Sequence, residues 1–212
     1  MDNIGHFDIQ LHGWWRTASG HTEGDRLDDV IQKSPEGLPW LAGRTLKGLL
    51  RDAACQLCAL GHARQDMIDA VFGLHVSNVH APGLAIEARY LTEPAAYRFG
   101  SGEMNAMWRD WASGAGKENA AAQSVIAALF DRRSMTAIES DGLAKTGSLR
   151  RVEVAAPVHL TAPIWCLHDV PGAIDLLEKS AGLIKALGAG RTRGFGRVTV
   201  RLDLEQPAEG TA

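Results

Sequence analysis

Residues 6–14 read His6-Phe7-Asp8-Ile9-Gln10-Leu11-His12-Gly13-Trp14, and apolar side chains alternate with polar ones along most of this run. Phe7, Ile9 and Leu11 share one face of an extended chain, which is the pattern of a half-buried β-strand. Arg197–Leu204 repeats the alternation near the other end of the chain. These two runs are therefore predicted to be the first and last strands of the fold.

Helical spacing dominates two segments between these strands. Leu46–Leu60 carries leucines at helical intervals with alanines between them, and Gly61 follows as a stop signal. Ala173–Leu187 has a continuous apolar face at the same spacing. A short helix over Gln65–Phe72 is predicted to follow the first of these helices.

The middle of the chain is predicted to hold further strands and an insertion. A strand is expected at Leu84–Leu91, and Glu103–Phe130 is expected to be irregular and then helical. Ser134–Glu139 and Leu149–Leu160 flank the turn signal Asp141-Gly142 and are predicted to pair as a long hairpin.

The resulting order is strand, helix, strands, a long insertion, helix and strand. This order predicts an α+β chain with a ferredoxin-like (RRM-like) βαββαβ core, a long inserted β-hairpin and a helical insertion. We expect a single domain over residues 1–204, with the insertion at about 92–160. Residues 205–212 are expected to form a disordered tail.

The composition excludes several classes of protein. The chain has 212 residues, of which 45% are hydrophobic and 22% charged, so a disordered or fibrous protein is not expected. No apolar run is long enough to cross a membrane, and no membrane partner is expected. Residues 1–5 carry no basic, apolar leader, so a cytoplasmic protein is expected. Three cysteines argue against a disulfide framework.

The net charge of −3 argues at first against a nucleic-acid binder, but the charge is unevenly distributed. Three basic windows, Arg44–Arg51, Arg132–Arg151 and Arg191–Arg201, hold twelve of the 22 lysines and arginines and two of the 25 acidic residues. They carry +10, and the rest of the chain carries −13. If the windows converge in space they form a strongly basic face, and otherwise they are ordinary solvated charges.

Gly188–Gly196 has a composition that suits phosphate binding, with four glycines and two arginines in nine residues. Glycine permits a close approach of the backbone, and exposed amides with arginines bind phosphate oxygens. A helix precedes this loop and a strand follows it, which is the reverse of a dinucleotide-binding loop. The segment Leu38–Arg51 adds Gly43, Arg44 and Thr45 near a helix start, where anions bind.

Two further groups of residues have a spacing that suits metal ions. Asp25–Asp29 holds clustered carboxylates, which either coordinate a divalent cation or form a solvated turn. Cys55, Cys58 and His62 have a spacing similar to that of zinc ligands. These three residues also lie at helical intervals, so thiols on a buried helix face are the favoured interpretation and zinc is not expected.

Three segments together resemble one known family. Leu41–Arg51 is similar to the segment Pro-Gly-Ser-Ser-Leu-Lys-Gly-x-Leu-Arg of the RAMP proteins of CRISPR systems. Gly188–Gly196 is similar to the glycine-rich loop that names this superfamily, and Ser148–Glu153 resembles the end of its central hairpin. Within the superfamily, the chain most resembles the backbone subunit of type III effector complexes. The resemblance extends over nearly the whole chain.

This resemblance implies a set of partners and an activity. Copies of the chain and other CRISPR effector subunits would assemble on a guide RNA in an antiviral ribonucleoprotein, and the hairpin would act as a thumb between bases. The assembly would bind single-stranded target RNA and cut it as a metal-dependent endoribonuclease, with Mg²⁺ or another divalent cation. Asp28 stands at the family's catalytic and metal-binding position, but Val30 replaces the family's proline, so Asp29 stays an alternative catalytic residue.

The implied RNA contacts come from the basic windows, the hairpin tip and the glycine-rich loop. They are Gly43, Arg44, Thr45, Lys47, Arg51, Arg132, Arg133, Leu143, Arg150, Arg151, Gly190, Arg191, Arg193, Gly194 and Gly196.

Three other functions stay open. A structural or capping RAMP subunit would bind RNA without cutting it. A guide-processing endoribonuclease would use His12 or His21 as a general acid or base. A metalloenzyme would use Cys55, Cys58 and His62.

Overall fold

The fold is built on a four-stranded antiparallel sheet. The computed structural model describes residues 1–17, 29–73, 95–114 and 119–205. Within these residues the sheet has the strand order β2-β5-β1-β6. Its strands are β1 (Asp2–Leu11), β2 (Tyr97–Phe99), β5 (His159–Cys166) and β6 (Val198–Leu204). The first and last strands predicted from the sequence are therefore neighbours, with Phe7 opposite Leu202.

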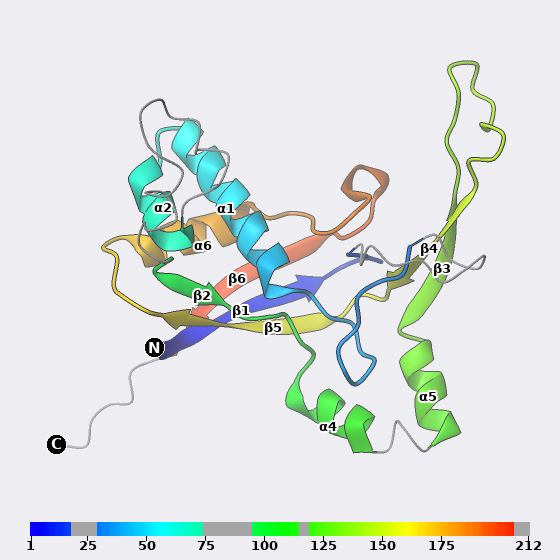
Figure 1. Cartoon of the computed structure of the whole chain (residues 1–212), viewed down its shortest axis with the longest axis horizontal. Coiled ribbons are helices and arrows are strands. Elements are labelled where there is room, and N and C mark those ends of the chain that lie inside the picture. Colours follow the sequence, from blue (N-terminus) through cyan, green and yellow to red (C-terminus); the bar gives the residue numbers. More distant parts are fainter. Residues whose placement is uncertain (18–28, 74–94, 115–118, 206–212) are drawn as a thin grey trace, which may run out of the picture.

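Three helices lie on one side of this sheet (Figure 1). In chain order, α1 (Gly43–Ala59) and α2 (Gln65–Phe72) come between β1 and β2, and α6 (Ala173–Leu183) comes between β5 and β6. The side chains of Phe7, Ile9 and Leu11 alternate along β1 and are at most 1% exposed. Each such burial contributes about 1.5–3 kcal/mol, so the layer between sheet and helices is the main core.

A second sheet forms a hairpin that projects from the body of the molecule (Figure 1). Its strands are β3 (Phe130–Met135) and β4 (Arg150–Ala155), paired from Phe130 opposite Ala155 to Met135 opposite Arg150. Two short helices, α4 (Ala106–Gly114) and α5 (Ala120–Ala127), precede the hairpin in the chain. The combination of helices with antiparallel sheets agrees with the predicted α+β class.

The predicted elements exist where periodicity was strong, but their ends differ. β1 begins at Asp2 instead of His6, and α1 begins at Gly43 instead of Leu46. The early start of α1 follows from the main chain, because the Ala42 carbonyl already accepts a bond from the Leu46 N–H at 3.1 Å. α6 ends at Leu183.

The predicted strand over 149–160 is wrong, because two different strands occupy this region. β4 ends at Ala155 and pairs in the hairpin, whereas β5 begins at His159 and lies in the centre of the larger sheet. Pro157 lies between them and has no N–H to donate to a ladder, which accounts for the break.

One strand of the sheet was missed, and one predicted strand has no outcome. β2 was not predicted, since three residues are too few to show alternation. The strand predicted at Leu84–Leu91 lies outside the described residues.

Candidate nucleic-acid interface

The glycine-rich loop forms a compact turn with two arginines on its outside. Arg191–Arg193 makes one turn of 3-10 helix between Gly190 and Gly194, whose φ angles of 80° and 82° lie in the left-handed region. Both arginines are exposed. At Gly196 a Cβ atom would lie 1.9 Å from the carbonyl oxygen of Leu187, so a side chain there would displace the backbone. Glycine is thus required by close backbone contact as well as by conformation.

Residues 14–16 attach this loop to the rest of the molecule. The Ala189 N–H donates to the carbonyl oxygen of Arg16 at 2.9 Å, and the Gly196 N–H donates to that of Trp14 at 2.8 Å. Because both bonds are between main-chain groups, the loop is held against residues 14–16 whatever side chains they carry.

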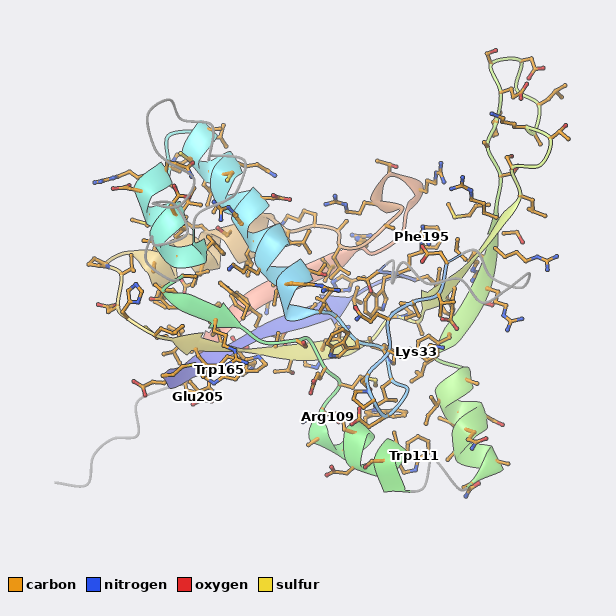
Figure 2. All side chains as sticks on the ribbon, in the orientation of Figure 1. Lys33, Arg109, Trp111, Trp165, Phe195 and Glu205 are labelled. Atoms are coloured by element: carbon orange, nitrogen blue, oxygen red, sulfur yellow. The ribbon has the colours of Figure 1, made fainter. Side chains whose placement is uncertain are left out.

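The same three residues hold the hairpin. Trp15 and Ala155 exchange main-chain hydrogen bonds of 3.0 and 2.7 Å, and the buried Trp15 ring donates from Nε1 to the Ala156 carbonyl at 3.0 Å. The Arg133 guanidinium lies 5.3 Å from the centre of the Trp14 ring. We call residues 14–16 the brace, since they bind the second and third basic windows to one another. Figure 2 shows the loop residue Phe195 between the loop and the base of the hairpin.

The first basic window lies on α1, and its cationic side chains have two kinds of surroundings, at the surface and within the protein. Arg44 is exposed and Thr45 half-buried in the first turn of the helix. Lys47 is half-buried, and burial, followed by the charge of Arg51, lowers the pKa of its ammonium group. Arg51 binds inside the protein, to the Asp69 carboxylate at 3.0 Å and to the Gly73 carbonyl at 2.5 Å. This guanidinium joins α1 to α2.

The outer face of α1 reaches the glycine-rich loop across an open cleft of about 510 Å³. Leu49, Asp52 and Gln56 of α1 line one side of the cleft, and Lys185 and Arg191 line the other. The cleft therefore connects the first basic window to the third.

The three basic windows, whose convergence the sequence left open, do not all contribute to one face. Arg197 and Arg201 alternate with the buried Val198 and Val200, so they point to the face of the sheet opposite the helices. Arg201 lies across from Asp8 of β1. The basic surface around the brace accordingly draws on Arg191 and Arg193 from the third window.

The hairpin carries exposed cations along its strands and exposed apolar side chains toward its tip. Arg132, Arg133, Arg150 and Arg151 are exposed, and Arg133 also pairs with Asp131 at 2.9 Å. Leu143, predicted at the tip, is 67% exposed. Ile138 and Leu149, which the sequence interpretation missed, are 72% and 60% exposed. Three large apolar side chains on one projecting hairpin form a surface suited to contact with a partner.

The two candidate catalytic aspartates have different outcomes. Asp28 lies outside the described residues. The Asp29 carboxylate accepts a hydrogen bond from Nη1 of Arg16 at 2.5 Å, and the Asp29 carbonyl accepts one from the Glu153 N–H at 3.0 Å. Asp29 thus joins the brace to β4. Lys33, which binds Glu153 at 2.9 Å, adds a second contact near the hairpin base (Figure 2).

The other predicted ligands and histidines are spread over the surface. Cys55 is exposed and Cys58 half-buried, so the expected burial of both thiols on one helix face is wrong for Cys55. His62 is also exposed. No cluster of three His, Cys, Asp or Glu side chains placed to hold a metal occurs among the described residues. His12 bonds to Oγ1 of Thr199 at 2.8 Å, and His21 lies outside the described ranges.

The sequence interpretation also missed the brace, because it assigned no role to Trp14, Trp15 and Arg16. Two adjacent tryptophans and an arginine stand at 14–16, shortly after β1 ends at Leu11. Nothing in the local sequence indicates that their carbonyls would receive the loop and the hairpin.

The chain is similar to known proteins in its structure but matches none of those compared in sequence. No protein-family model and no curated protein matches the chain in sequence. Among solved structures, the chain is similar to chains of type III-B Cmr-beta. One is in the cryo-EM structure of the type III-B Cmr-beta complex bound to cognate target RNA, with a TM-score of 0.66, 12% identity, and 95% of this chain and 97% of that chain covered. Another is in the type III-B Cmr-beta apo state, with a TM-score of 0.65, 12% identity and coverage of 94% and 97%.

This likeness covers nearly the whole of both chains, so the chain has the fold of a type III-B Cmr-beta subunit. The structural neighbours agree with the family that the sequence motifs resemble. None of the helices in the described parts of the chain is both long and apolar enough to span a membrane.

Proposed function

We propose that the chain is a guide-RNA-binding backbone subunit of a type III CRISPR ribonucleoprotein. In this proposal the four-stranded sheet with α1 and α6 is a ferredoxin-like core, and the β3–β4 hairpin is a thumb. The strand order supports the first assignment, since each helix connects two strands that have one other strand between them. The observation that carries the proposal is the brace, which holds the arginine-bearing loop and the projecting hairpin on one body.

The proposed contacts divide into phosphate binding and base separation. Arg191 and Arg193 bind guide phosphates from the loop, and Arg44 binds from the first turn of α1. Such contacts fix the position of RNA without reading its sequence. Leu143 at the hairpin tip, with Ile138 and Leu149 behind it, inserts between bases. Repeated copies would place these hairpins at regular intervals along the guide, beside other subunits of the complex.

We further propose that the chain cuts target RNA at Asp28. Asp29 already has a cationic partner in Arg16, which favours Asp28 as the residue that acts on RNA. Asp28 together with RNA phosphate oxygens would hold Mg²⁺ or another divalent cation, which supplies neutralisation of the developing charge. Asp28 would orient the ribose 2′-hydroxyl, which loses its proton to water as its oxygen attacks the adjacent phosphorus. The bond from phosphorus to the 5′-oxygen breaks, and this leaving oxygen takes a proton from water. The product strand then ends in a 2′,3′-cyclic phosphate.

Guide binding is tested by replacing Arg191 and Arg193 together with alanine in the full chain. We expect weaker guide binding, and a salt dependence of log Kd that decreases by about 0.7 for each phosphate that the variant no longer binds. Arg64→Ala is the matched control, because Arg64 is exposed, pairs with Asp66 on the surface and lies outside the basic windows. Unchanged guide affinity and salt dependence in the double variant would reject the assignment.

A second test separates a cutting subunit from a capping subunit. The complex is reconstituted with guide RNA and supplied with labelled target RNA and Mg²⁺. Cuts at a regular spacing that disappear with Asp28→Ala support the proposal. A complex that binds target and leaves it intact supports the non-catalytic alternative.

A further inference from the structure

A second open cleft lies at the β2 edge of the sheet, apart from the brace. It has a volume of about 500 Å³. The residues that matter for its chemistry are Trp40, Gly43, Arg44, Arg98, Ser101 and Trp165. They come from the chain before α1, the first turn of α1, β2 with the residues after it, and β5. The glycine-rich loop and the hairpin contribute no residue to its lining among the described residues.

The wall formed by α1 is held tightly against the main chain after β2. A Cβ atom on Gly43 would lie 2.5 Å from the carbonyl oxygen of Phe99 and 2.7 Å from that of Gly100. The Gly43 N–H donates to Oγ of Ser101 at 3.4 Å. The absence of a side chain at Gly43 thus lets Arg44 line the same cleft as Arg98.

The charge of the cleft is positive. Arg44 and Arg98 both line it and are both exposed. Its carboxylate, Glu103, is bound to Nη1 of Arg109 at 2.6 Å and is therefore already neutralised. Two guanidinium groups with no competing acid suit a phosphodiester, which guanidinium binds with two parallel hydrogen bonds.

Two tryptophans line the cleft, in addition to Phe99, whose ring stacks on those of Phe7 and Phe72. The Arg98 guanidinium lies over the Trp165 ring at 5.4 Å from its centre. Trp165 lies on the sheet face opposite α1 and α6, because it alternates with the buried Ala162 and Ile164 of β5 (Figure 2). Unpaired bases stack on tryptophan rings and on guanidinium planes, so this pair and Trp40 offer a surface for a base.

We propose that this cleft binds one nucleotide of single-stranded RNA, with its phosphate on Arg44 and Arg98 and its base against Trp40 or the Arg98–Trp165 pair. The inference rests on the RNA-binding function proposed above, and it adds Arg98, Trp40 and Trp165, which lie outside the basic windows, to the phosphate contact already proposed for Arg44. The guide and the target strand share the chemistry required, so the experiment must distinguish them.

The test uses photocrosslinking in the reconstituted complex of full-length chain, guide and target. 5-Iodouridine, which crosslinks to aromatic side chains in contact with it, is placed either in the guide or in the target. We expect crosslinks to peptides that contain Trp40 or Trp165, and the labelled strand that produces them identifies the source of the nucleotide. Arg98→Ala should reduce the crosslink yield and weaken binding of that strand about tenfold. Arg64→Ala should change neither quantity.

The outcomes separate this inference from the proposed function. If neither strand crosslinks to Trp40 or Trp165, or if Arg98→Ala leaves yield and affinity unchanged while the Arg191 and Arg193 variant weakens guide binding, the cleft assignment is overturned and the function stands. If neither variant changes the binding of any RNA, both are overturned.

Discussion

Replacing Asp29 with asparagine separates a structural role from a catalytic one. The carboxylate is 20% exposed and its partner Arg16 is 15% exposed, with 2.5 Å between Oδ2 and Nη1. Nε of Arg16 is buried and has no hydrogen-bond partner among the described residues. Removal of the charge at Asp29 therefore leaves a half-buried guanidinium without its counter-ion.

The expected loss of stability follows from this partial burial. A hydrogen bond between charged groups contributes about 1.5–3 kcal/mol to stability, and the remaining exposure places this pair at the lower end. We expect Asp29→Asn to lower the free energy of unfolding by about 1.5–2 kcal/mol. For a chain of this size the corresponding fall in Tm is about 4–6 °C.

The assays are thermal unfolding of the full chain and cleavage of labelled target RNA by the reconstituted complex. Asp29→Asn should lower Tm and leave cleavage at the normal sites, measured well below the new Tm. Asp28→Asn is the counterpart, for which we expect loss of cleavage by at least about 100-fold with guide binding retained. An Asp29→Asn chain with unchanged Tm and no cleavage would refute the reasoning and assign catalysis to Asp29.

Three further predictions follow from the interface. Leu143→Asp should leave Tm unchanged and weaken guide binding, measured by fluorescence anisotropy, because its side chain is 67% exposed; a lowered Tm would show that it packs within the protein. Gly196→Ala should lower the free energy of unfolding by about 3 kcal/mol, because its Cβ would contact the Leu187 carbonyl. Gly194→Ala should lower it by about 1 kcal/mol, because nothing lies within 4 Å of a Cβ there. Equal losses of Tm in the two variants would contradict this expectation. Burial lowers the pKa of Lys47, so its ammonium group loses its charge as pH rises toward the ordinary lysine value of 10.5. Guide affinity should therefore decline over this range, and Lys47→Arg should remove the decline. Identical pH profiles of the two proteins would exclude a charged contact at this position.

The parts of the fold that could be predicted from the sequence are those with repeated local patterns. Strict alternation identified β1 and β6, and leucine spacing identified α1 and α6. β5 was missed as a separate strand because the alternation of residues 149–160 continues across Pro157. The assignment of two halves of one run to two sheets is decided by tertiary pairing, which local periodicity does not contain.

In the candidate site, too, features with a local sequence pattern could be predicted, whereas contacts made by packing could not. The glycine-rich loop was found from its composition, and its arginines are exposed as an RNA contact requires. Arg51, placed with Lys47 in the first basic window, instead binds Asp69 and the Gly73 carbonyl. Spacing shows which residues share a helix face, but it does not show which other helix will pack against that face.

The brace determines which properties of this chain amino-acid substitutions can alter. Since the loop and the hairpin are both bonded to the peptide groups of residues 14–16, the distance between them is a property of the backbone. Under the proposed function, substitutions of the arginines or at the hairpin tip would change how strongly RNA is held, while the length of RNA occupied by each copy would stay constant. A different length would require insertion or deletion of residues in the chain, so under the proposed function the step of each copy along the RNA is set by the backbone.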